Sequence, residues 1–369
     1  GVQTCALPIF AIVGPAARVA VASVEERRVL VERDVGAQAF EGAQAPGGAL
    51  LVGTVDGRVL ALDPATLETR AEVDMGEGAV TDIVAPRADL AAALVGKTRV
   101  VIFEPGNGGV RREIDLAEHG TFGALHAAVL PGGDVRILVT SHGFHGPHTQ
   151  SASASAALLD PASDAAPRLL RHGAPVVDAS VAAGRAMAVT VDASGVVRGI
   201  DLARGEWTRG EDGVLTSTGL PGAAVAIDGT ATRLVVGADV GVGAGEDAVL
   251  GFALDEGGGA RRIWTAPGGR RIADLAFRPG RPEVACASWL ADPPPRILHA
   301  DSGEIVRVHR EVALPKELTW STGGERLLGV GNISFVDVWS GAPGAGAHRL
   351  SWRRGGRLVE PSGGAFVPG

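Results

Sequence analysis

The stretch from Ala39 to Thr66 reads AFEGAQAPGGALLVGTVDGRVLALDPAT, and it sets out the unit that the rest of the chain repeats. An apolar run ends near a proline, a second apolar run and a turn follow, and a third run closes on Asp63. Period-two alternation and β-branched residues in such runs are typical of β-strands, and Gly, Pro and Asp supply the turns between them. The stretch therefore predicts short strands joined by tight turns, with little room for helices.

The same layout returns along the chain at intervals of about 45 to 50 residues, which is the size of one four-stranded propeller blade. It recurs in DIVAPRADLAAALVGKTRVVIFEPG (82–106) and in LAFRPGRPEVACASWLADPPPRILHADSGE (275–304). Approximate starts of successive units are Val80, Leu125, Val177, Val225, Asp274 and Leu318. About seven full units fit between Gln38 and Trp352, with a partial unit at each end.

The third runs share an ending in which an acidic residue is followed by small residues. These endings are Asp63-Pro-Ala-Thr, Asp160-Pro-Ala-Ser, Asp201-Leu-Ala-Arg-Gly, Asp301-Ser-Gly-Glu and Val336-Asp337-Val338-Trp339. In them the chain resembles the WD-repeat and quinoprotein-like β-propellers, over nearly all of Phe10 to Trp352. The resemblance implies an all-β propeller of seven to eight four-stranded blades. We expect eight, with the last blade shared between both termini, because such pairing removes an exposed sheet edge.

The chain departs from the WD-repeat pattern in its histidines. His119-Gly and His172-Gly lie at about the right places, but the family's Gly-His order is reversed. The hydrogen-bonded His–Asp network of that family is therefore not expected here.

The first nine residues, GVQTCALPI, resemble a translated sequencing adapter. We expect residues 1–9 to be an artefact and residues 10–369 to form a single propeller domain, as a fragment of a longer protein. A cytoplasmic location is expected, with a periplasmic or secreted one as the alternative, since such a leader would replace the native N-terminus.

Charge and hydropathy limit the classes of partner. The net charge is −8 and basic residues form no run longer than pairs such as Arg353-Arg354, so a nucleic-acid partner is not expected. No stretch approaches 18 consecutive apolar residues, so no membrane insertion is expected in the visible chain. Cys286 lies in an apolar run and is expected to be a small core residue. No cofactor is predicted.

Familiar catalytic motifs find no support. Gly96-Lys97-Thr98 resembles the end of a phosphate-binding loop, but Ala91 stands where the preceding glycine is needed and a strand follows, which indicates a hairpin turn. GVGAGE (241–246) also precedes a strand, which favours a hairpin loop over a dinucleotide site. The sequence contains no G-x-S-x-G elbow and no H-E-x-x-H motif.

Three long insertions are predicted to join the second and third strands of their blades and so to rise from one face. The first holds three histidines at three-residue intervals, which are candidate ligands for a metal such as zinc, copper or nickel, or else members of an exposed polar loop. Loops gathered on one face of a rigid scaffold are where binding usually resides. The predicted binding face comprises His142, His145, His148, Asp239, Glu246, Asp247, Trp289 and Asp292.

A second set of residues is expected near the start of the innermost strands, at the mouth of the central channel. It comprises Asp82, His126, Asp178, Asp274 and Glu317. Such a ring can hold a cation or a basic side chain. Alternatively, each carboxylate caps amides of the neighbouring blade.

Two functions follow from these residues, and the sequence leaves both open. The first is a non-catalytic scaffold that binds a protein or peptide on the loop-rich face. The second is an extracytoplasmic quinoprotein-like or metal-dependent enzyme whose site lies over the channel, with the His142 loop and the acidic ring as ligands. The absence of a catalytic motif favours the first.

Overall fold

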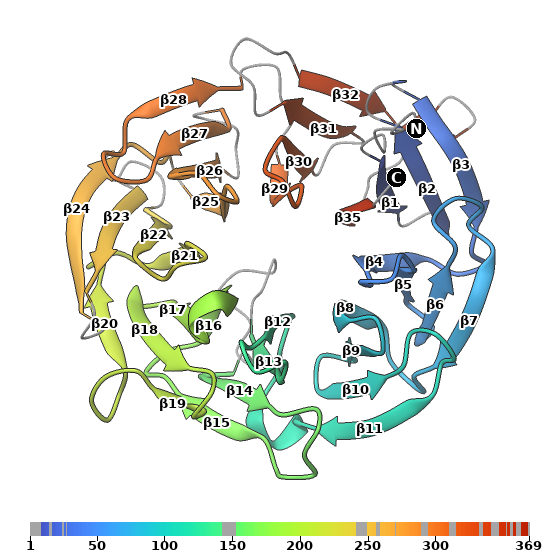
Figure 1. The fold of residues 1–369 in the computed structure, drawn as a ribbon, viewed down its shortest axis with the longest axis horizontal. Coiled ribbons are helices and arrows are strands. Elements are labelled where there is room, and N and C mark those ends of the chain that lie inside the picture. The colour runs from blue at the N-terminus through green and yellow to red at the C-terminus, as the bar shows by residue number, and fades with distance from the viewer. Residues whose placement is uncertain are drawn as a thin grey trace. The chain divides into compact units, whose positions relative to one another are not determined.

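The computed structural model describes 9–14, 17–23, 26, 28–141, 153–240, 249–255, 259–269, 271–288, 294–309, 315–331, 335–340, 347–351, 353–354, 357–358 and 363–367. These residues form an all-β chain of short antiparallel strands (Figure 1). Their helical content is two 3₁₀ turns, η1 (Ala117–His119) and η2 (Ala183–Arg185). The predicted β-propeller of four-stranded blades is confirmed.

The chain divides into two compact units. Unit 1 comprises Gly1–Asp115 and Thr319–Gly369, and unit 2 comprises Leu116–Leu318. Among the described residues there are seven four-stranded sheets, one five-stranded sheet and one two-stranded sheet. We refer to each sheet of four or five strands as a blade.

Two blades of unit 1 run in chain order. They are β4 (Ala39–Gln44), β5 (Leu50–Thr54), β6 (Arg58–Leu62) and β7 (Thr69–Asp74), then β8 (Val80–Arg87), β9 (Leu90–Val95), β10 (Arg99–Phe103) and β11 (Val110–Asp115). A further blade follows unit 2 and begins across the boundary. It contains β29 (Pro315–Trp320), β30 (Arg326–Gly331), β31 (Phe335–Ser340) and β32 (Ala347–Ser351).

Unit 2 contributes four blades, each of which also follows chain order (Figure 1). The first two are β12 (Ala124–Val129), β13 (Val135–Thr140), β14 (Ser155–Leu159) and β15 (Arg168–Arg171), then β16 (Val176–Ala182), β17 (Met187–Asp192), β18 (Val196–Asp201), β19 (Glu206–Trp207) and β20 (Val214–Ser217). The others are β21 (Gly222–Ile227), β22 (Arg233–Ala238), β23 (Val249–Leu254) and β24 (Ala260–Ala266), then β25 (Ile272–Phe277), β26 (Glu283–Ser288), β27 (Arg296–His299) and β28 (Ile305–Val308).

Both ends of the chain meet in one blade of unit 1. Its strand order is β3 (Arg28–Asp34), β2 (Arg18–Ser23), β1 (Ile9–Gly14) and β35 (Gly363–Val367), and β1 pairs antiparallel with β35 from Ile9↔Val367 to Val13↔Gly363. The predicted pairing of the termini is therefore observed. A small sheet of β33 (Arg353–Arg354) and β34 (Arg357–Leu358) precedes β35. The first eight residues of the leader lie outside the described residues.

Removal of residues 358–369 tests this pairing. Because the deletion leaves the β1 edge without its partner strand, we expect a lower melting temperature and the appearance of dimers or larger species. Circular dichroism melting and size-exclusion chromatography measure the two effects. An unchanged melting curve with a monomer profile would contradict the role of β35 in this blade.

Glycines in second strands let neighbouring blades approach closely. A Cβ added at Gly53 in β5 would lie 2.5 Å from Val80 Cγ1 in β8, and one added at Gly237 in β22 would lie 2.5 Å from Ile272 Cβ in β25. Val80 and Ile272 each open the first strand of the next blade and are fully buried. This close packing of neighbouring blades occurs in both units, and it accounts for glycine at these two strand positions.

A backbone hydrogen bond of one kind fixes the end of the outer strand in at least four blades. We call the residue directly after a fourth strand the corner residue. Its amide donates to the carbonyl of the residue directly before the third strand of the same blade, and this bond is present at Val35→Ala17 (2.7 Å), Met75→Gly57 (2.8 Å), His172→Ala154 (2.7 Å) and His309→Pro295 (2.8 Å).

The acidic endings recognised in the sequence have a local structural cause. The Oδ1 atom of Asp63 accepts the amides of Ala65 (2.8 Å) and Thr66 (3.0 Å), and that of Asp201 accepts the amides of Ala203 and Arg204 (both 3.0 Å). Each aspartate therefore closes the turn between the third and fourth strands by bonding backbone two and three residues ahead.

Candidate functional site

The connections between second and third strands separate three blades from the rest. Five blades use three residues, at 15–17, 55–57, 96–98, 193–195 and 332–334. The other three use 141–154, 239–248 and 289–295, which are 14, ten and seven residues long by the bounds of their strands. All three long connections belong to unit 2. Their predicted position between second and third strands agrees with the strand order.

All eight residues of the predicted binding face fall within these connections. His142, His145, His148, Glu246, Asp247, Trp289 and Asp292 lie outside the described residues. Asp239 is described, and its amide donates to Pro221 O at 2.9 Å. It also forms an isolated β-bridge with Arg271, whose Nε lies 3.7 Å from Asp239 Oδ2. The start of the 239–248 connection is thereby attached to the next blade.

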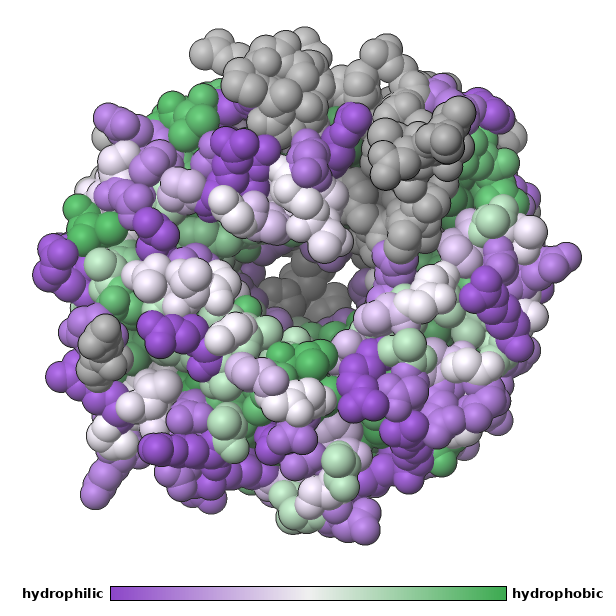
Figure 2. Space-filling model, viewed as in Figure 1, coloured by the Kyte–Doolittle hydropathy of each residue, from purple (hydrophilic) through white to green (hydrophobic). Residues whose placement is uncertain are grey.

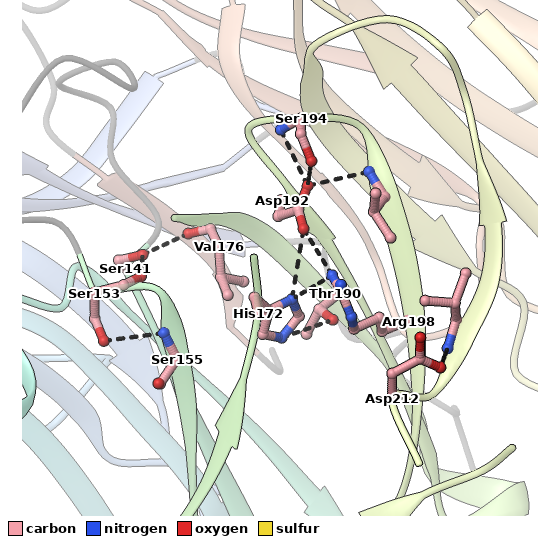
Figure 3. Close-up of polar contacts among 12 residues, drawn as sticks. Ser141, Ser153, Ser155, His172, Val176, Thr190, Asp192, Ser194, Arg198 and Asp212 are labelled. Carbon is pink, nitrogen blue, oxygen red and sulfur yellow. Dashed lines mark hydrogen bonds and ion pairs between the residues drawn. The ribbon is translucent and has the colours of Figure 1, made fainter. Parts of the chain in front are cut away.

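The two ends of the 141–154 connection are held together. Ser141 Oγ lies 2.8 Å from Ser153 O and 2.7 Å from Val176 O (Figure 3). Ser153 N donates to Thr121 O at 3.1 Å. Ser141 and Ser153 are both buried. His126, predicted for the channel mouth, is half-buried on β12 with its Nε2 3.3 Å from Thr140 Oγ1, just before the connection begins. The described ends of the connection, Ser141 and Ser153, are therefore held to each other and to β16.

Next to these ends lies a buried network around His172 (Figure 3). Arg198 Nη1 donates to Asp192 Oδ2 at 2.7 Å and lies 3.2 Å from His172 Nδ1. His172 Nε2 lies 3.5 Å from Thr190 Oγ1, and the ring packs edge-on against Trp207 with centroids 5.4 Å apart. Nδ1 faces an arginine donor and must accept, so the ring is neutral with its proton on Nε2.

The hydrogen-bonded His–Asp network of the WD-repeat family was not expected here, and His172 and Asp192 form no direct hydrogen bond. His172 Nδ1 lies 3.9 Å from Asp192 Oδ2, and both atoms face Arg198 Nη1, which lies between them. The threonine, histidine and aspartate also resemble a nucleophile, base and acid. However, Thr190 and Asp192 are fully buried and Arg198 lies between the ring and the carboxylate, so the arrangement holds the blade together and offers no access to a substrate.

Burial of the ring sets its protonation. The pKa of His172 is lowered to about 4, chiefly by desolvation and also by the Arg198 charge, while Asp192 acts in the opposite direction. The close approach of His172 to Asp192 is therefore not an ion pair near neutral pH. The same carboxylate also accepts the Ser194 amide (3.0 Å), the Ser194 hydroxyl (2.6 Å) and the Val196 amide (3.1 Å) through Oδ1.

Arg198 is one of three arginines that reach from a third strand to the corner residue of the preceding blade. Arg99 donates to Met75 O, and Arg296 donates to Pro267 O, the residue that follows β24. These contacts were not predicted, because no local motif marks them. Arg58 follows the same Thr-Val-Asp sequence at 54–56 that precedes Arg198 at 190–192, yet it bonds Asp56 and Glu72 of its own blade.

Two of the predicted channel-mouth carboxylates bind the backbone of the next first strand. Asp178 accepts Ala179 N and Val225 N, each at 2.8 Å, and Asp274 accepts Leu275 N at 2.7 Å and Leu318 N at 2.6 Å. Desolvation raises the pKa of Asp274 well above its usual value, and the nearby Asp178 and Glu317 charges raise it further. These contacts match the capping role that the sequence left open as an alternative.

The remaining members of the predicted ring are Asp82 and Glu317. Asp82 Oδ1 accepts its neighbour Ile83 N at 2.7 Å in unit 1, whereas Glu317 lies half-buried on β29 in unit 2. In the part of the chain that the structure describes, no three His, Cys, Asp or Glu residues are grouped closely enough to hold a metal ion. Cys286 is buried and unpaired, and burial raises the pKa of its thiol to about 11.

Replacement of Asp178 by alanine tests the capping contact. The change leaves the Val225 amide buried without its acceptor, so we expect the free energy of unfolding to fall by about 1–3 kcal/mol. Chemical denaturation followed by tryptophan fluorescence measures this change. Asp164→Ala, at an exposed turn position, is the matched control and should shift stability by less than about 0.5 kcal/mol. Equal stability of the two variants would contradict a capping role.

The exposed surface in view is largely hydrophilic (Figure 2). The outer strand β28 is an exception, because Ile305 is 55% exposed and Val306 50% exposed. The β27–β28 register shifts where Val306 is inserted opposite Ile297 and Leu298. Such a bulge disrupts the edge, so β28 is poorly suited to pairing with another strand.

No family model matches the chain, and no curated protein matches it in sequence. Solved structures are similar to it in fold. Chaetomium thermophilum Sqt1, bound to the N-terminus of ribosomal protein L10, is 16% identical with a TM-score of 0.67, over 86% of this chain and 88% of that chain. BamB from Moraxella catarrhalis is 14% identical with a TM-score of 0.61, over 89% and 90%.

The dihydro-heme d1 dehydrogenase NirN, in complex with DHE, is 14% identical with a TM-score of 0.67, over 97% of this chain and 75% of that chain. At these identities the likeness shows the β-propeller fold and no more. Within the described residues, no helix has the length and hydrophobicity needed to span a bilayer.

Proposed function

We propose that this protein is a non-catalytic scaffold that binds a protein or peptide at the end of unit 2 from which the three long connections leave. The observation that carries the proposal is their distribution. Five blades keep a three-residue turn at this position, whereas three blades of unit 2 extend it to between seven and 14 residues. Long loops on one end of a rigid β framework are a common arrangement for binding.

The framework under these connections is ordered. Ser141 ties the two ends of the first to Val176, and Asp239 ties the start of the second to Arg271. His309 N bonds Pro295 O at the end of the third. Fixed roots reduce the conformational freedom that a bound partner would otherwise have to restrict, and this supports binding at this end.

The charge of the connections indicates the chemistry of the partner. They contain four acidic residues, Asp239, Glu246, Asp247 and Asp292, and no lysine or arginine. Opposite charges speed association and favour correct partners, so we propose a segment that carries Lys or Arg. The peptide complex of Sqt1 is a precedent for such binding on this fold.

The test is selection from a displayed library of random peptides against the full chain. The comparison variant has each of 141–154, 239–248 and 289–295 replaced by Ala-Ser-Gly, the turn of residues 193–195. A control variant replaces 193–195 with Val-Asp-Gly, the turn of residues 55–57. We expect Lys/Arg-containing peptides that bind the wild type and the control and bind the shortened variant at least tenfold more weakly. Equal binding to all three proteins would overturn the proposal.

Metal analysis of the purified chain separates this function from a metal-dependent enzyme. Stoichiometric zinc, copper or nickel that is lost on combined His142→Ala and His145→Ala substitution would favour the enzyme. A scaffold that needs no metal should bind its selected peptides equally well after treatment with a chelator.

A further inference from the structure

Two buried histidines occupy the same place beneath two of the long connections. His172 and His309 are both corner residues, and their amides donate to Ala154 O (2.7 Å) and Pro295 O (2.8 Å). Ala154 and Pro295 are the last residues of the 141–154 and 289–295 connections. His172 is 9% exposed and His309 is 7% exposed. In two other blades, whose connections have three residues, the corner position holds Val35 or Met75.

The backbone around His172 continues into the base of the insertion. Ser153, next to Ala154, accepts a hydrogen bond from Ser141 Oγ at 2.8 Å and one from Val176 N at 3.4 Å. Two backbone hydrogen bonds therefore join the corner segment 172–176 to the root of the connection, one from His172 to Ala154 and one from Val176 to Ser153. A movement of the His172 ring out of its site would strain both.

The side-chain contacts of His172 require a neutral ring. Its Nδ1 accepts from Arg198, and the charged groups that act on it are Arg198 on β18 and Asp192 on β17. A proton on Nδ1 would replace that hydrogen bond by two donors facing each other, with a positive charge on each. At His309, burial is the main cause that disfavours protonation, and the charge of Arg307 on β28 acts in the same direction.

We propose that His172 and His309 form a pair of acid-sensitive latches that hold the roots of the 141–154 and 289–295 connections and release them when the rings are protonated. Each latch consists of a buried imidazole, an arginine that opposes its protonation, and the corner-to-root backbone bond. The proposal does not depend on which partner the connections bind.

The direction of the pH effect follows from linkage. Burial and the arginines lower the pKa of each ring to about 4 in the closed form, from an ordinary value of 6.5. The closed form is therefore fully favoured above pH 6.5, and its advantage is lost as the pH falls from 6.5 towards 4. For one such ring the open form gains about 30-fold in relative population at pH 5.

Hydrogen exchange of the full chain, corrected for intrinsic rates, tests the latches between pH 7.5 and pH 5. We expect amides at 153–157, 172–177 and 296–298 to lose up to about 30-fold in protection, while 90–95 in β9 stays unchanged. His172→Gln keeps a neutral acceptor and should remove the pH dependence at 153–157 and 172–177 but not at 296–298. His309→Gln should do the reverse, and His119→Gln, on the half-exposed η1 turn, should change neither.

A wild-type chain whose protection at these segments does not depend on pH would overturn the proposal, whether or not the variants fold. Persistence of the effect at 153–157 in His172→Gln would also overturn it. Peptide binding at pH 7.5 is a separate readout, so failure of the latches and failure of the proposed binding function are distinguishable.

Discussion

Replacement of Asp192 by alanine is expected to lower the free energy of unfolding by about 3–5 kcal/mol, because it leaves the Arg198 guanidinium buried without its counter-charge. The carboxylate is fully buried and accepts from Arg198, Ser194 and Val196. Its loss removes both the ion pair and the acceptor that closes the turn between β17 and β18. Urea denaturation followed by tryptophan fluorescence measures the change.

Two further variants distinguish the effect of leaving Arg198 without its counter-charge from the effect of losing an aspartate that accepts a turn amide. Asp212→Ala removes an exposed aspartate that accepts one amide, that of Val214 at 3.2 Å, and should change stability by less than about 0.5 kcal/mol. Combining Asp192→Ala with Arg198→Met removes the stranded charge and should recover part of the loss. If Asp192→Ala is as stable as Asp212→Ala, the buried network does not stabilise this blade.

Replacement of Gly251 by alanine is expected to lower the free energy of unfolding by about 3 kcal/mol. Gly251 on β23 lies directly opposite Trp264 on β24, and an added Cβ would overlap the indole ring. The ring cannot move aside easily, since Gly303 lies against it and Trp264 Nε1 donates to Ala300 O at 2.8 Å in the next blade. Displacement of the ring would therefore disturb two blades.

Gly106→Ala is the matched control for this change. An added Cβ at Gly106 meets nothing within 4 Å, so stability should change by less than about 0.5 kcal/mol. Thermal melting of the two variants compares them directly. If Gly251→Ala has the same melting temperature as Gly106→Ala, the Trp264 indole does not fill the space above Gly251.

The blade pattern could be predicted from the sequence because its signals are local. An aspartate that bonds amides two and three residues ahead, as at Asp63 and Asp201, leaves the same short motif wherever the turn recurs. Alternation of apolar residues marks the strands between the turns. The position of the long connections followed from the same count, since a longer gap between second and third strands is visible in the sequence.

The side-chain network could not be predicted because its contacts are distant in the chain. His172 meets Arg198 across 26 residues, a separation at which no local sequence motif marks the contact. The two roles of the acidic ring were equally compatible with the sequence. Only the positions of the Val225 and Leu318 amides show that Asp178 and Asp274 cap the next strand.

The most direct test of the account is a hydrogen-exchange comparison of the full chain with and without a selected Lys/Arg-containing peptide. If the end of unit 2 with the long connections is the binding surface, protection should appear at 139–141, 153–156, 238–240 and 286–288. The turns between third and fourth strands at 160–167 and 299–304, at the other end of the same blades, should be unaffected. Protection confined to those turns would contradict the account.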